Sequence, residues 1–175
     1  MASAHPQFWQ EYQYLMQEQR LRMIVDKVTL MNASTQARTI SLVSKIANIS
    51  NIFQAEYPSA IVDFSPWALD EASQREFDAN SLDLSFSFPG RYSHLSCRCI
   101  LLQVYFLGEL QSSARILYKI KMTGHDYRGQ RWRFSTHADW QFSGLGMPSE
   151  EGQQQLKSVV GQLHTLFGHP VPLPQ

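Results

Sequence analysis

The feature that most constrains the fold is a regular alternation in residues 131–142, RWRFSTHADWQF. Every second position is apolar or small: Trp132, Phe134, Thr136, Ala138, Trp140 and Phe142. The positions between them carry mostly polar side chains: Arg131, Arg133, Ser135, His137, Asp139 and Gln141. Because successive side chains of a strand point to opposite faces, the pattern predicts a strand with one buried and one polar face. An antiparallel sheet with one solvated side produces this alternation.

Three further segments have strand character. LDLSFSF (82–88) alternates strictly, SCRCILLQVYFLG (96–108) is apolar on both faces after Arg98, and ARILYKIKMTG (114–124) alternates again. The segment HDYRGQ (125–130) predicts a hairpin loop, in which Gly129 is the conformationally permissive residue. The sequence therefore predicts a meander of about four antiparallel strands.

Helical periodicity dominates the rest of the chain. A first helix is expected after Pro6, up to about Val28. A second is expected over about 35–55, with a strand as the competing interpretation of 38–46; its predicted apolar stripe is Ile40, Val43, Ile46, Ala47, Ser50 and Phe53. Ser65 and Pro66 predict a short helix that ends near Phe77. Ser149 predicts the cap of a C-terminal helix with the stripe Leu156, Val159, Val160, Leu163 and Phe167.

Together these segments predict a single α+β domain over residues 1–175. Residues 1–80 are expected to be mainly helical, 81–144 to form the sheet, and 149–168 to form a C-terminal helix packed on one sheet face. The proline-rich residues 169–175 are expected to be an extended tail.

Composition narrows the classes of function. The 15 basic and 15 acidic residues cancel, whereas duplex nucleic-acid binders usually carry a basic surplus. No apolar run approaches the roughly 20 residues of a membrane span, and the N-terminus lacks the pattern of a signal peptide, so a cytoplasmic protein is expected. The two cysteines, Cys97 and Cys99, have no second pair or regularly spaced histidine to complete a metal site. No cofactor and no metal are expected.

The strongest candidate site is the polar face of the last predicted hairpin. Cross-strand neighbours approach to about 5 Å between Cβ atoms, so this face would gather a basic patch: Arg115, Lys119, Lys121, Arg131 and Arg133, together with His137 and Asp139. A local basic face on a neutral chain predicts an anionic ligand or an acidic partner surface. The simpler interpretation is a solvated sheet surface with one exposed ion pair, which stabilises a fold by only about 0–1 kcal/mol.

These residues favour a non-enzymatic accessory protein that acts through contacts with another protein, using this face and the aromatic N-terminal helix. No catalytic residue is assigned. The alternative is a small-ligand-binding or hydrolytic domain with a site around His125, His137 and Asp139, since acid–base chemistry requires a histidine oriented by a carboxylate. Single-stranded nucleic-acid binding is a weaker alternative, because the alternation puts the aromatic rings and the arginines on opposite faces. The partner's identity and the oligomeric state are not encoded in any recognisable motif.

Overall fold

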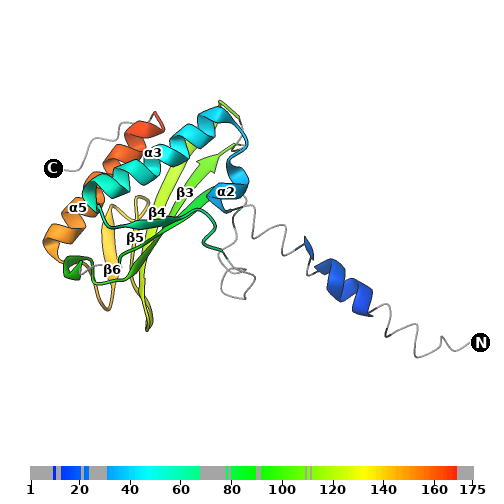
Figure 1. Cartoon of the computed structure of the whole chain (residues 1–175), viewed down its shortest axis with the longest axis horizontal. Coiled ribbons are helices and arrows are strands. Elements are labelled where there is room, and N and C mark those ends of the chain that lie inside the picture. Colours follow the sequence, from blue (N-terminus) through cyan, green and yellow to red (C-terminus); the bar gives the residue numbers. More distant parts are fainter. Residues whose placement is uncertain are drawn as a thin grey trace, which may run out of the picture.

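The protein has an α+β structure with one antiparallel sheet and a C-terminal helix (Figure 1). The computed structural model describes residues 10, 13–20, 22–23, 31–67, 78, 80–89, 92–108, 110 and 112–168. The sheet has six strands, each antiparallel to the next, in the order β1-β2-β3-β4-β5-β6. Their bounds are β1 (Ile61–Asp63), β2 (Ser81–Ser87), β3 (Cys99–Leu107), β4 (Ile116–Asp126), β5 (Gly129–Ser135) and β6 (Gln141–Gly144).

The prediction of about four strands was wrong because two edge strands are short. β1 has only three residues, too few to show an alternation. β6 was hidden inside the alternating stretch 131–142, which is two strands and not one. A turn over 136–140 reverses the chain, with Asp139 and Trp140 in the left-handed region at φ 50° and 57°. The chain then folds back so that Phe142 lies opposite Phe134 in the β5–β6 register.

The hairpin between β4 and β5 is also tighter than predicted. Only Tyr127 and Arg128 form the turn, while 125–126 and 129–130 belong to the strands. Gly129 follows the turn as the first residue of β5, and its φ of 102° is a backbone conformation that favours glycine.

The helix predicted over 35–55 is two helices, α2 (Ala33–Gln36) and α3 (Ile40–Glu56). Thr39 separates them and caps α3, since its side chain accepts a hydrogen bond from the backbone N–H of Leu42 (3.2 Å). The strand interpretation of 38–46 was therefore wrong. The predicted stripe was partly wrong, because Ile40 is 91% and Val43 47% exposed. The buried face of α3 consists of Leu42, Ile46, Ile49, Ser50 and Phe53.

The C-terminal helix is α5 (Glu150–Leu166), and a single 3₁₀ turn, η1 (Ser93–Leu95), precedes β3. Ser149 caps α5 by accepting from the N–H of Gly152 (3.2 Å). At the N-terminus, residues 13–20 and 22–23 are helical and exposed. The remainder of the predicted first helix, the predicted 66–77 helix beyond Trp67 and the predicted tail lie outside the described residues.

The core contains side chains from both long helices and from one side of the sheet. Phe53 of α3 stacks on Phe86 of β2 with ring centroids 3.9 Å apart. Trp132 of β5 is fully buried, and its indole N–H donates to the carbonyl of Leu95 (2.8 Å). From α5 the core includes Leu156, Val159, Val160 and Leu163. Figure 1 shows α3 and α5 on the same side of the sheet. We call the opposite side, away from these two helices, the outer face.

Candidate functional site

A group of cations lies on the outer face of β4 and β5. Lys119 and Lys121 alternate along β4 with the fully buried Ile120 and Met122, so the two lysines point away from the core. On β5, Arg133 follows the buried Trp132 and lies opposite Thr123, two residues along β4 from Lys121. We call Lys119, Lys121 and Arg133 the basic face. The two-residue periodicity of the sequence predicted this grouping.

Aromatic and hydroxyl side chains hold the basic face in place. Lys119 lies opposite Tyr105 of β3 in the register, and its Nζ is 4.0 Å from the centroid of that ring, which is a cation–π contact. The Nε of Arg133 donates to the hydroxyl of Ser143 on β6 (3.1 Å). Lys121 lies between Gln103 and Ser135 in the register. Because these contacts orient the charged groups, less side-chain entropy is lost when a ligand binds.

One edge of the basic face is formed by Tyr118 and His137. The strand pairing shifts between Tyr105 and Phe106, so Tyr118 has no direct partner in β3. The ring of His137, from the turn after β5, lies 4.4 Å from that of Tyr118. The Nζ of Lys119 is 6.0 Å from the Tyr118 ring. His137 therefore joins the basic face through a tyrosine and not as a member of a strand.

The other three predicted binding residues make different contacts. Arg131 pairs with Asp126, with Nε 3.3 Å from Oδ2, so its charge is matched locally. Asp139 occupies the left-handed turn after β5 and is exposed. Arg115 precedes β4 and lies over the core residue Phe106, 5.9 Å from guanidinium carbon to ring centroid.

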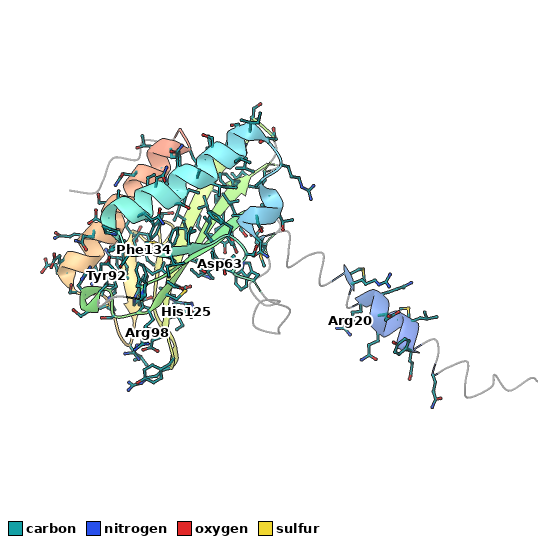
Figure 2. The ribbon with its side chains drawn as sticks, in the orientation of Figure 1. Arg20, Asp63, Tyr92, Arg98, His125 and Phe134 are labelled. Atoms are coloured by element: carbon teal, nitrogen blue, oxygen red, sulfur yellow. The ribbon has the colours of Figure 1, made fainter. Side chains whose placement is uncertain are left out.

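The histidines of the predicted ligand or hydrolytic site are far apart. His125 is near the end of β4, where its Nε2 is 2.9 Å from the hydroxyl of Thr123. Figure 2 shows it beside Arg98, whose backbone N–H donates to the His125 carbonyl (2.8 Å). His137 contacts Tyr118, which lies seven residues before His125 on β4. At about 3.3 Å per residue, the two histidines are roughly 20 Å apart.

A buried polar cluster on the outer face was not predicted. Asp83 of β2 is fully buried, and its carboxylate accepts hydrogen bonds from the indole of Trp67 and from Nε2 of Gln103 (3.1 Å to the latter). Burial raises the pKa of Asp83 to about 7, against the opposing effect of its hydrogen bonds. Within the described part of the chain, Asp83 Oδ1 and Gln103 Oε1 have no hydrogen-bond partner. The sequence signal for Asp83 was only its polar position in LDLSFSF, which predicted an exposed side chain.

The two cysteines are free and half-buried. Burial raises the pKa of Cys97 to about 12 and also raises that of Cys99, so neither is a thiolate at neutral pH. Across the described ranges, no three histidine, cysteine or acidic side chains are grouped so that they could hold a metal ion. The helices in those ranges are also too short or too polar to cross a membrane.

Comparison with models of protein families gives one match. A family model described as a domain of unknown function matches residues 34–169. The chain belongs to this family. The matched segment includes all six strands and both long helices, so the basic face lies entirely within the family domain. Neither the curated proteins nor the solved structures gave a match.

Proposed function

We propose that this protein is a non-enzymatic binding protein that holds an acidic surface of another protein against its basic face. The observation that supports this most is the convergence of Lys119, Lys121 and Arg133 from two adjacent strands on the side of the sheet away from the long helices. The chain as a whole is neutral. A concentrated positive surface on a neutral protein steers oppositely charged partners and selects against basic ones.

Exposed apolar residues beside the basic face favour a protein partner. Leu107 and Ile116 lie opposite each other in the β3–β4 register, near the end of the sheet that carries Lys119. Their exposed fractions are 53% and 49%, and that of Tyr118 is 45%. Protein interfaces combine an apolar and aromatic centre with a polar rim. A free inorganic anion would use the cations but would gain nothing from these three side chains.

We favour binding over hydrolysis because of the separation between His125 and His137. A histidine that acts as a general base must lie within hydrogen-bond reach of the proton it removes, and a second group must orient it. His125 bonds to Thr123, and His137 contacts the Tyr118 ring. His125 therefore lies near the end of β4, whereas His137, from the turn after β5, lies beside Tyr118 near the start of β4.

Charge reversal tests the proposal. The variant Lys119→Glu, Lys121→Glu, Arg133→Glu inverts the basic face. A matched control, Arg38→Glu, Arg128→Glu, Lys157→Glu, makes the same change in net charge at α3's start, at the β4–β5 turn and on α5. The affinity-purified wild type and the control should retain the same companion protein. The basic-face variant should lose it while keeping the circular dichroism spectrum of the wild type.

The salt dependence gives a second readout. Exposed charges are screened beyond a Debye length of about 8 Å at physiological ionic strength. Retention of the companion by the wild type should therefore decrease as salt is added. A companion that the basic-face variant retains as strongly as the control does, at all salt concentrations, would refute the proposal.

A further inference from the structure

A small pocket away from the outer face collects two cations. It has a volume of about 170 Å³ and is lined by residues from α3, from β3, from the segment before β4 and from the C-cap of α5: Ser41, Lys45, Phe106, Ser113, Arg115 and Phe167. Pockets for drug-sized ligands typically measure about 300–1,000 Å³. This pocket therefore suits a small ion or one group of a larger molecule.

Aromatic rings place the two cations beside each other. The Nζ of Lys45 is 5.0 Å from the Phe167 ring centroid, and the guanidinium carbon of Arg115 is 5.9 Å from that of Phe106. The two rings contact each other edge to face, with centroids 5.1 Å apart. One aromatic pair thus supports both charges.

Backbone carbonyls hold the arginine, and no acidic side chain of the described residues pairs with it. Its Nη1 donates to the carbonyls of Leu110 and Ser112, both at 3.1 Å. Its Nε is buried and lacks a hydrogen-bond partner among the described residues. A guanidinium has five N–H donors in a fixed plane. Arg115 is therefore fixed in position and still has donor capacity.

Partial burial disfavours the charged forms of both cations, and the neighbouring arginine disfavours that of the lysine further. Burial and the neighbouring Arg115 charge lower the pKa of Lys45, and burial lowers the pKa of Arg115. Two like charges in a partly desolvated pocket repel each other. An anion between them would replace this repulsion with attraction to both.

The start of α3 adds to the positive potential. Ser41 lies in the first turn of this 17-residue helix, which has no acidic residue there, and Lys45 is one turn further along. The N-terminus of a helix carries a partial positive charge and favours anions. Ser41 and Ser113 also line the pocket, and each carries a hydroxyl that can donate a hydrogen bond.

We propose that this pocket binds the phosphate group of a small molecule. The side chains that line the pocket indicate this class of ligand. A phosphate carries up to two negative charges and several acceptor oxygens, which match an ammonium, a guanidinium and two hydroxyls. The site is distinct from the basic face, which uses other residues on the other side of the sheet.

Titration of the full chain with inorganic phosphate tests the proposal. Sodium chloride is exchanged for phosphate at constant ionic strength, and binding is measured by isothermal titration calorimetry and by the thermal midpoint. The variants Lys45→Met and Arg115→Met should weaken phosphate binding by about tenfold or more each, since each removes a charge-assisted contact. The matched controls Lys157→Met and Arg128→Met should change it by less than about twofold.

A second titration with glycerol phosphate identifies the source of the group. Tighter binding of the ester indicates a phosphorylated small molecule, and tighter binding of inorganic phosphate indicates the free ion. If Arg115→Met does not fold, because Arg115 anchors two carbonyls, Lys45→Met and the milder Arg115→Lys carry the test. A wild type that binds phosphate no better than chloride would overturn the proposal, as would equal losses in the pocket variants and the controls.

Discussion

The buried carboxyl of Asp83 should make the free energy of unfolding fall as the pH rises. The substitution Asp83→Asn should abolish this fall. Asp83→Asn preserves the size of the side chain and removes the charge that burial opposes. In the folded protein burial raises the pKa of Asp83 to about 7, whereas an Asp carboxyl in an unfolded chain titrates near about 3.9. The folded state therefore binds this proton more tightly than the unfolded state does.

The magnitude follows from the linkage between proton binding and folding. Between the two pKa values the free energy of unfolding falls by about 1.4 kcal/mol for each unit of pH rise. From about pH 5 to about pH 7 the wild type should lose about 2 to 3 kcal/mol on this account. The stabilisation from the tighter proton binding of folded Asp83 is fully present below about pH 4 and is lost as the pH rises through about 7.

The free energy of unfolding of Asp83→Asn should not fall as the pH rises over this range. At about pH 8 it should exceed that of the wild type by up to about 4 kcal/mol, the full difference between the two pKa values. The amide also brings N–H donors to a place where Gln103 Oε1 lacks a partner in the described structure.

Urea unfolding followed by tryptophan fluorescence at several pH values measures this effect. The matched control is Asp139→Asn, at an exposed turn position, which should retain the pH dependence of the wild type. A wild-type free energy that does not fall over this range, or an Asp83→Asn protein that falls in parallel with it, would refute the account of Asp83.

Three substitutions test the packing. Gly124→Ala places a Cβ against the buried indole of Trp132 and should lower the free energy of unfolding by about 1–3 kcal/mol. Phe53→Ala removes the ring stacked on Phe86 and should cost about 3–5 kcal/mol. Thr39→Ala removes the side-chain cap of α3 and should cost about 1 kcal/mol, while Thr39→Ser should cost almost nothing. Chemical denaturation measures each value. An alanine at 124 that is tolerated without loss would contradict the tight contact with Trp132.

The alternation in the second half of the chain predicted most of the sheet. β2, β4 and β5 fall where the two-residue period indicated and β3 where the continuous apolar run did, with Phe134 and Trp132 in the core as expected. Figure 2 shows Phe134 on the side of the helices. The turn over 136–140 escaped detection because it contains no glycine or proline and maintains the alternation. Its left-handed residues are Asp139 and Trp140, and tryptophan gives no turn signal.

The orientation of α3 illustrates a different difficulty. Several apolar residues compete for the buried stripe, and the sequence alone does not say which of them meets the sheet. The helix begins at Ile40 and not near Thr35, and Leu42 and Ile49 face the core in place of Ile40 and Val43. Tertiary packing decides which of these residues are buried, and helical periodicity alone does not specify that packing.

The candidate sites were predictable to unequal degrees. The grouping of Lys119 and Lys121 with Arg133 follows from the period of two within one hairpin. The pairing of Lys45 with Arg115 does not, because it joins α3 to the segment before β4. Such a contact depends on how a helix crosses a sheet, and no local pattern specifies it.

Site-specific crosslinking tests most directly whether the basic face binds a protein. A photoreactive amino acid at Ser135, which lies opposite Lys121, would be irradiated in the cells that make this protein and compared with the same group at Lys157 on α5. Binding of an acidic protein by the basic face predicts one recurrent crosslinked protein from position 135, attached through an acidic segment and absent from position 157. Identical products from both positions, or a chain that gives no crosslink and elutes at its own mass of 20.1 kDa, would contradict it.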